Sequence, residues 1–338
     1  MDLERRCLRL GVWVIALAAA MRLVGSGLGG QARAFFGRPE TASFLLYLQS
    51  GRVARPAEEE SVPPQTQPVP TLREETNPTQ PAIPAPERPA FCPEDAGFVE
   101  ITYHSDYEPD LETLLCGTLS WELTGDEPTV LIYHSHATES YTPSAGETYQ
   151  ESSAYRTLDT NYNMVSVGDR LAQLLRAQGI GVVHDRTLHD EPSYSAAYSS
   201  SRKSVQALLE QYPSVRLVID LHRDALSLDS GKQLDTHALV DGKDSAQLML
   251  VVGTDDGGLT HPNWQENLAL ALKLHVLLER ENPGITRPIS FRTQRFNQDL
   301  SPGTVLIEVG AAGDSHTEAL TAAEALAQAI LTLSKGTQ

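Results

Sequence analysis

The chain of 338 residues has few cysteines and few basic residues. Its three cysteines, Cys7, Cys92 and Cys116, form no CxxC or other close pair, which argues against a zinc cluster built from thiolates. Any bound metal would therefore be held by histidine and carboxylate side chains, and a Cys92–Cys116 disulfide stays an open alternative. The formal charge of −18 argues against a nucleic-acid-binding protein, which needs a basic face, and against docking on anionic lipid by charge alone.

The N-terminus lacks an uninterrupted apolar run of the ~20 residues that a membrane-spanning helix needs. Residues 10–21 are apolar and follow three arginines, but Arg22 interrupts the run. Residues 23–30 are small and uncharged, and the Arg22 side chain can reach the interface by snorkelling. We therefore expect residues 1–30 to be an uncleaved signal anchor that leaves the rest of the chain outside the cytoplasm, at the cell membrane. A signal cleaved near Ala34 and a buried core helix are the alternatives.

Composition divides the remaining chain into three parts. Residues 31–54 include the apolar cluster at 44–48 and are expected to form a juxtamembrane segment. Residues 55–95 hold 11 of the 21 prolines, mixed with Glu, Gln and Thr, so they are predicted to be an extended linker that buries too little apolar surface to fold. Residues 96–338 carry the periodic apolar pattern of a folded domain.

Strand and helix patterns alternate in this domain. Short apolar runs at 129–133, 181–184, 217–221, 247–252 and 305–309 predict buried strands. Helical periodicity occurs at 164–175, 193–212 and 263–281 and again after the capping box formed by Ser315 and Glu318. The pattern predicts a single α/β domain with a mostly parallel, twisted sheet flanked by helices. In such a sheet, functional sites form at the carboxyl ends of the strands.

Three of the predicted strands end in polar side chains. The first runs into His134, His136 and Glu139, the second into His222, Arg223 and Asp224, and the last contains Glu308. Two imidazoles and a carboxylate, with a fourth position for water, make a catalytic zinc site, and a further carboxylate beside the water can act as general base. Each histidine is alternatively a hydrogen-bonded strand-end residue, and Arg223 is alternatively the structural partner of Glu308.

Several long segments resemble one known family. These segments are IYHSHATESY, YRTLDTNYNMVSVGDRLA, HDEPSYSAAYSSSR, VIDLHRDA and RFNQDLSPGTVLIEVG, and FLLYLQSGR precedes them. They are similar to the stage II sporulation protein P family, cell-wall hydrolases of endospore-forming bacteria that are related to the zinc-dependent N-acetylmuramoyl-L-alanine amidases. The likeness runs from about residue 44 to near the C-terminus, apart from the proline-rich segment, and implies an amidase-like fold.

The resemblance also implies roles for individual residues. His136 and His222 match the two histidine ligands of Zn²⁺, and Glu308 matches the catalytic glutamate. Glu139 is the expected carboxylate ligand, and the alternates are Asp159 and Glu151. Alternation along an extended segment would put His134 on the same face as His136, so either of the two is open as the ligand. His134 or Arg223 is expected to assist catalysis by stabilising the oxyanion.

The activity implied by the family is hydrolysis of the amide between N-acetylmuramic acid and L-alanine in peptidoglycan, with endopeptidase activity on stem-peptide cross-links as a second reaction. The implied setting is the sporulation septum during engulfment, with stage II sporulation proteins D and M (SpoIID and SpoIIM) as partners. Two rival functions stay open from the residues: a peptidoglycan-binding protein without catalysis, and a zinc endopeptidase without amidase activity.

Overall fold

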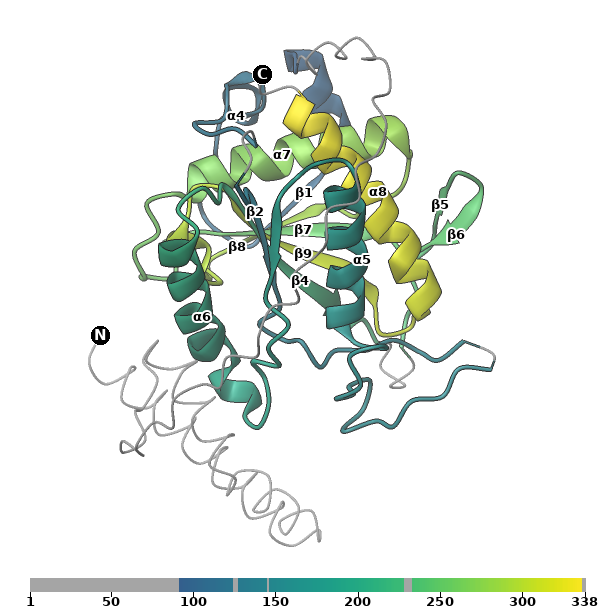
Figure 1. Cartoon of the computed structure of the whole chain (residues 1–338). Coiled ribbons are helices and arrows are strands. Elements are labelled where there is room, and N and C mark those ends of the chain that lie inside the picture. The colour runs from purple at the N-terminus through teal and green to yellow at the C-terminus, as the bar shows by residue number, and fades with distance from the viewer. Residues whose placement is uncertain (1–90, 124–126, 145, 228–232, 336–338) are drawn as a thin grey trace, which may run out of the picture. The chain divides into compact units, whose positions relative to one another are not determined.

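The computed structural model describes residues 91–123, 127–144, 146–227 and 233–335 (Figure 1). The expected anchor at 1–30, the juxtamembrane segment at 31–54 and residues 55–90 of the expected linker lie outside the described residues. Among the residues that are described, none of the helices combines the length and hydrophobicity needed to cross a membrane. Residues 93–98 already form a 3-10 helix, η1 (Pro93–Phe98), whose Asp95 is buried and pairs with Arg280 of the folded domain.

A seven-stranded sheet forms the centre of the domain. Its order is β1-β8-β7-β9-β4-β2-β3, and every neighbouring pair is parallel except β7 and β9, which are antiparallel. The prediction of a mostly parallel sheet is therefore confirmed. The strands are β1 (Ile101–Tyr103), β2 (Val130–Tyr133), β3 (Val182–His184), β4 (Leu217–Asp224), β7 (Leu248–Gly253), β8 (Ile289–Arg292) and β9 (Thr304–Ala311). A separate hairpin, β5 (Ala238–Val240) and β6 (Lys243–Ser245), projects from one side of the domain (Figure 1).

Helices pack on both faces of this sheet. They are α4 (Leu111–Cys116), α5 (Met164–Ala177), α6 (Ala197–Gln211), α7 (Trp264–Glu281) and α8 (His316–Lys335). Because side chains alternate along a strand, Val130 and Ile132 of β2 join the core cluster that contains α5, α7 and α8, whereas Leu131 and Tyr133 pack with Val205 of α6. Full burial of each such aliphatic side chain stabilises the fold by about 1.5–3 kcal/mol.

The capping box predicted before α8 is present, and α5 also has capping residues at its ends. The capping box before α8 is formed, since Ser315 N donates to Glu318 Oε2 at 2.7 Å and Glu318 N donates to Ser315 Oγ at 3.2 Å. At the start of α5, Val165 N donates to the Asn163 side chain at 3.0 Å. The chain leaves this helix through Gly179, whose φ of +85° is in the left-handed region that favours glycine.

Strand β4 is longer than the apolar run that predicted it. We expected the strand to end at residue 221 and to be followed by His222, Arg223 and Asp224, but all three belong to β4. Pairing with β9 extends the strand, and a register shift between His222 and Asp224 marks its irregular end. The polar side chains therefore lie on the sheet itself, near the carboxyl ends of β4 and β9.

Candidate active site

His222 and Glu308 are direct neighbours in the sheet. They are paired positions in the parallel register of β4 and β9. Alternate residues of the two strands, such as Leu221 and Ile307, belong to the core cluster on the other face, so His222 and Glu308 share the face on which α6 packs. The topology thus brings together two residues that are 86 positions apart in the sequence.

Asp220 holds the ring of His222 from one side. His222 Nε2 lies 2.9 Å from Asp220 Oδ1 and 2.7 Å from Ser135 Oγ, and Ser135 also donates its backbone N–H to Asp220 at 2.8 Å. Burial acts to lower the pKa of His222, but the charge and hydrogen bond of Asp220 outweigh it and raise this pKa to about 10. These contacts occupy Nε2, whereas Nδ1 of the same ring faces Glu139.

His136 reaches the same place from the turn after β2. Residues 135–138 form this turn, and the His136 ring stacks on Tyr194 with centroids 4.3 Å apart and lies edge-on to His222 at 5.3 Å. Its Nδ1 is buried and has no hydrogen-bond partner. Burial lowers the pKa of His136 to about 4, so at neutral pH the ring is uncharged, which is the form that ligates metal.

Glu139 is the carboxylate that lies beside His222. Its Oε2 lies 3.7 Å from His222 Nδ1 and accepts the backbone N–H of Arg223 at 3.1 Å. The two alternative carboxylate ligands, Glu151 and Asp159, are exposed in the following loop. Glu151 accepts the backbone N–H of Tyr155, and Asp159 accepts that of Asn161. The structure therefore brings together His136, Glu139, His222 and Glu308, and leaves Glu151 and Asp159 apart from them.

Arg156, which the sequence did not single out, holds Glu139 in place. Its guanidinium lies 3.1 Å from Glu139 Oε1 and 2.7 Å from Asp190 Oδ2, and it stacks over the Tyr194 ring at 4.7 Å. Asp190 in turn accepts the Thr138 hydroxyl at 2.6 Å. The turn that carries His136 and Glu139 is thus fixed by a charged network from the neighbouring loops.

His134 lies on the opposite side of the sheet from His136. Its Nδ1 is 3.0 Å from Leu221 O and its Nε2 is 2.8 Å from His184 Nε2, and both rings lie against Gly168 of α5. The expectation that both histidines share one face was wrong, because the chain turns after His134 and the alternation of an extended strand does not continue. Burial, followed by the neighbouring His184, lowers the pKa of His134 to about 3.

Gly168→Ala is expected to destabilise the protein by about 1–3 kcal/mol, since it overpacks a filled core position. A Cβ at this position would lie 2.5 Å from His184 Nε2 and 2.7 Å from His134 Nε2, so at least one ring would have to shift and strain its contact with Leu221 O or Asp169 Oδ1. Urea denaturation measures the loss, and Gly97→Ala, where nothing lies within 4 Å, is the matched control. Equal midpoints for Gly168→Ala and the wild type would contradict this account of the histidine pair.

The Arg223 side chain is directed toward the loop rather than toward Glu308. Its guanidinium donates to the Tyr155 carbonyl at 2.8 Å and to the Asp224 carbonyl at 3.2 Å. Glu308 Oε2 is buried without a hydrogen-bond partner. Burial raises the pKa of Glu308 to about 8, with His222 opposing the shift and Glu139 adding to it. A carboxyl group with a pKa near neutrality suits proton transfer.

The donor atoms at this site suit a zinc ion. In the described part of the chain, no group of three or more His, Cys, Asp or Glu residues is arranged closely enough to hold a metal as it stands. Nevertheless, His136 Nδ1 is buried without a partner, and Asp220 holds Nε2 of His222 as is usual for zinc-bound histidines. With its raised pKa, His222 would bind a metal through Nδ1 by releasing a proton. With Glu139 beside them, the side chains that could hold such an ion would be two histidines and one carboxylate.

Comparison with known proteins places this chain among sporulation proteins. The family model of "Stage II sporulation protein P (SpoIIP)" matches residues 52–331. Stage II sporulation protein P of Bacillus subtilis (strain 168) is 33% identical over 218 residues, a match that covers 61% of this chain and 51% of that protein. The match thus spans about half the length of this relative.

Among solved structures, the chain is similar to N-acetylmuramoyl-L-alanine amidases. One from Nostoc punctiforme has 16% identity and a TM-score of 0.35, covering 61% of this chain and 97% of that one. The catalytic domain of CwlV from Bacillus (Paenibacillus) polymyxa var. colistinus has 12% identity and a TM-score of 0.36, covering 60% and 96%.

Proposed function

This chain belongs to the stage II sporulation protein P family, and from that premise we propose that it is a peptidoglycan hydrolase of sporulation that cleaves the N-acetylmuramoyl-L-alanine amide bond with zinc. The observation that carries the proposal is the convergence of His136, Glu139 and His222 beside a carboxylate, Glu308, whose Oε2 has no partner. Two histidines and one carboxylate hold the metal, and the second carboxyl group, that of Glu308, is left for proton transfer.

Each residue has a separate task in the proposed reaction. When bound, Zn²⁺ supplies Lewis-acid activation of the amide carbonyl and of the attacking water. Glu308 takes the proton from the water and passes it to the leaving amine, which needs one group that is first base and then acid. Asp220 orients His222, and Arg156 orients Glu139, through the contacts described above.

Removal of zinc is expected to abolish peptide release from purified peptidoglycan, and one equivalent of zinc per chain should restore it. Mass spectrometry of the digest should find free stem peptides that begin with L-alanine and muramic acid residues without peptides. His222→Ala should bind less zinc and release no peptides, because one ligand is lost. The exposed His237→Ala is the control and should match the wild type in both respects.

The same digest separates the proposal from its two rivals. Peptides cut only at cross-links, with all muramoyl–alanine bonds intact, would mean a zinc endopeptidase. Binding to peptidoglycan in a sedimentation assay without any cleavage would mean a binding protein. Both cleavages together would add endopeptidase activity to the amidase, since the same attack serves both kinds of amide.

The proposed setting is the outer side of the membrane at the sporulation septum. The basic and apolar N-terminus at 1–30 supports an anchor, and the proline-rich stretch at 55–95 supports a tether that lets the domain reach the wall. Stage II sporulation proteins D and M are the proposed partners, on the ground of family membership.

A further inference from the structure

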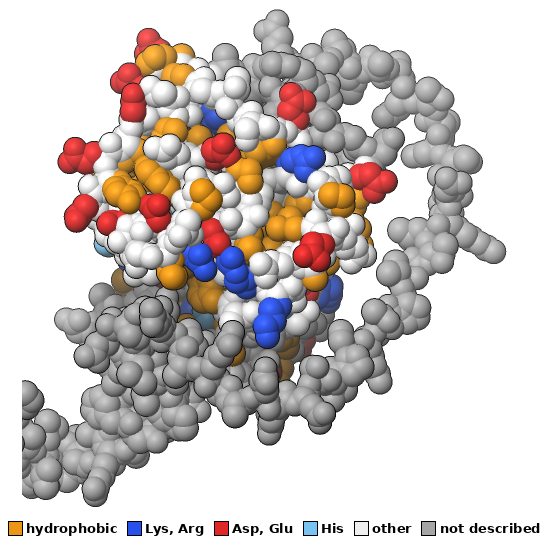
Figure 2. Space-filling view, turned by 90° about the vertical axis from the view of Figure 1, so that its left-hand side faces the viewer, with side chains coloured by type: hydrophobic (Ala, Val, Ile, Leu, Met, Phe, Trp, Pro, Cys, Tyr) orange, Lys and Arg blue, Asp and Glu red, His pale blue; other side chains and the backbone are white. Residues whose placement is uncertain are grey.

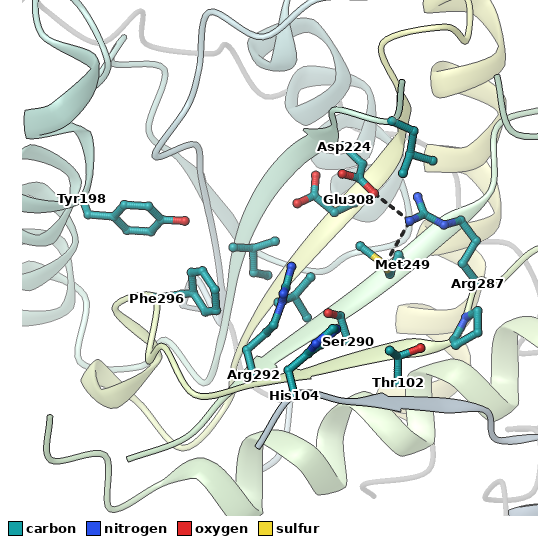
Figure 3. Close-up of a pocket in the computed structure, with 14 residues that line it drawn as sticks. Thr102, His104, Tyr198, Asp224, Met249, Arg287, Ser290, Arg292, Phe296 and Glu308 are labelled. Atoms are coloured by element: carbon teal, nitrogen blue, oxygen red, sulfur yellow. Dashed lines mark hydrogen bonds and ion pairs between the residues drawn. The ribbon is translucent and has the colours of Figure 1, made fainter. Parts of the chain in front are cut away.

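A cavity of about 360 Å³ adjoins the candidate active site on the same face of the sheet. Helix α6 packs over β2 on this face, and beyond it the outward-facing residues of β9, β7, β8 and β1 line the cavity. Glu308 forms part of its wall, so a substrate that reaches this carboxyl group also extends over the cavity (Figure 3).

Two arginines line the cavity, and of these two only Arg287 is paired with a carboxylate among the described residues. Arg287 Nη2 pairs with Asp224 Oδ2 at 2.6 Å, while Arg287 Nη1 is buried without a partner. Arg292 rises from β8 into the cavity (Figure 3), and its Nε is also buried without a partner. Among the described residues, none forms a hydrogen bond or ion pair with the Arg292 guanidinium. Leaving donors of a charged group unpaired in a half-buried position is unfavourable unless a ligand completes them.

This unpaired arginine is notable in a chain with 44 acidic and 26 basic residues. On the face drawn in Figure 2, acidic side chains are widely scattered, whereas most of the Lys and Arg side chains gather in its lower half. An acidic protein has many carboxylates with which to pair an arginine. That Arg292 has none suggests that its partner is an external carboxylate, which a guanidinium binds with two parallel hydrogen bonds.

Two aromatic side chains, Phe296 and Tyr198, also line the cavity (Figure 3). Phe296 and Tyr198 lie 6.0 Å apart there, and Phe296 has a φ of 49°, which is unfavourable for a bulky residue by about 1–3 kcal/mol. The next residue, Asn297, secures this conformation by donating its side-chain amide to Tyr198 O at 2.9 Å. The cavity thus offers aromatic surface as well as an unpaired cation, which fits a short aliphatic chain that ends in a carboxylate.

We propose that Arg292, with the free Nη1 of Arg287, binds a carboxylate of the stem peptide and so positions the scissile amide at Glu308. This inference rests on the proposed function and names the part of the substrate that the cavity recognises. In a muramoyl–alanine amide, the carboxyl group on the glycan side is consumed in the scissile bond. Free carboxylates are therefore found on the peptide side alone, and the cavity is the peptide subsite.

The test uses three synthetic muramyl tripeptides: one with all carboxylates free, one amidated at the second peptide residue and one amidated at the third. Wild-type protein is expected to cleave one of the amidated substrates with a kcat/KM about 10- to 100-fold lower, mainly through KM, as for the loss of a charge-assisted hydrogen bond. Arg292→Gln should lower kcat/KM for the free substrate to the same level and leave that amidated substrate unaffected. Arg295→Gln, which removes a guanidinium bonded to Thr260 O and Asp299 outside the cavity lining, is the matched control and should keep the wild-type preference.

A binding measurement keeps this inference separable from the proposed activity. Calorimetry with the free tripeptide and its two amides, using Glu308→Gln protein, needs no hydrolysis. If the wild type cleaves none of the three substrates but the peptides bind with an Arg292-dependent preference for one carboxylate, the proposed function fails and the subsite stands. Equal cleavage of all three substrates by the wild type, or an equal loss on all three in Arg292→Gln, would overturn the subsite.

Discussion

Glu308→Gln is expected to lower the rate of muramoyl-amide hydrolysis by roughly 10²–10⁴-fold, the usual contribution of a general acid–base group. Glutamine keeps the size of the side chain but neither accepts the proton of the attacking water nor returns one to the leaving amine. Because His136, Glu139 and His222 are unchanged, zinc content should stay at one equivalent per chain. Initial rates with a soluble muramyl peptide, together with metal analysis, give both readouts.

The stability of the same variant gives an independent check. In zinc-free protein, burial raises the pKa of Glu308 from 4.5 to about 8, so between these pH values the folded state holds a proton that the unfolded state has lost. Native stability therefore falls as pH rises through this window, and the whole penalty is present above pH 8. Glu308→Gln removes the penalty, so its gain in stability over the wild type should be larger at pH 8.5 than at pH 4.

A matched control is Glu324→Gln, which changes a carboxylate on α8 that pairs with Arg170 and Lys243 at the surface. This variant should hydrolyse the substrate at the wild-type rate. Full activity of Glu308→Gln, by contrast, would show that another group takes the proton from water.

Most of the strands that the sequence revealed are buried on both faces, although the short run at 181–184 also predicted the edge strand β3. The runs at 129–133, 217–221, 247–252 and 305–309 are mostly apolar because β2, β4, β7 and β9 are interior strands. Strand β8 was missed because Ser290 and Arg292 alternate with Ile289 and Phe291, so that its four residues do not form an apolar run. One face of this strand lines the cavity, which explains the polar alternation. The order of the strands, including the antiparallel β7–β9 pair, depends on tertiary packing that no local pattern records.

The site residues that could be predicted are those at or near the ends of apolar runs. His136, Glu139, His222 and Glu308 follow or end apolar runs, and the structure brings them together. The directions of His134 and His136 were not predictable, since they depend on the turn at 135–138 and on contacts with α5 and α6. Arg156 lies in a loop whose course is set by its partners, so its role has no local signal.

Asp220 is a site residue that was not predicted, although its position in the sequence carries a signal. It lies inside the run LVIDL, whose other four residues are apolar. An aspartate inside a buried strand is unfavourable unless it has a partner. His222 is two positions further along the strand and therefore lies on the same face of the sheet. That spacing predicts an aspartate–histidine contact, and the structure contains it at 2.9 Å.

Asp220→Asn is therefore expected to weaken zinc binding by about 10- to 100-fold, the usual effect of removing a carboxylate that supports a metal-bound histidine. Asp220 is completely buried and accepts hydrogen bonds from Ser135 N and Ser135 Oγ at 2.8 and 2.7 Å in addition to its contact with His222. The amide group of asparagine would turn one acceptor into a donor facing another donor, so stability should also fall by about 1–3 kcal/mol. Zinc affinity by competition with a chromophoric chelator and urea denaturation measure the two effects.

The matched control for this variant is Asp95→Asn, because Asp95 is also a buried carboxylate and holds Cys92 N at 2.8 Å as well as Arg280. It lies in η1, which packs against α7 and α4, and it lines neither the cavity nor the zinc residues. Asp95→Asn should lose stability without losing zinc affinity, whereas Asp220→Asn should lose both. If zinc affinity were unchanged in Asp220→Asn at a temperature where the variant is fully folded, then the Asp220 contact would serve packing alone. His222 would in that case be held in its orientation by Ser135 without help from the carboxylate.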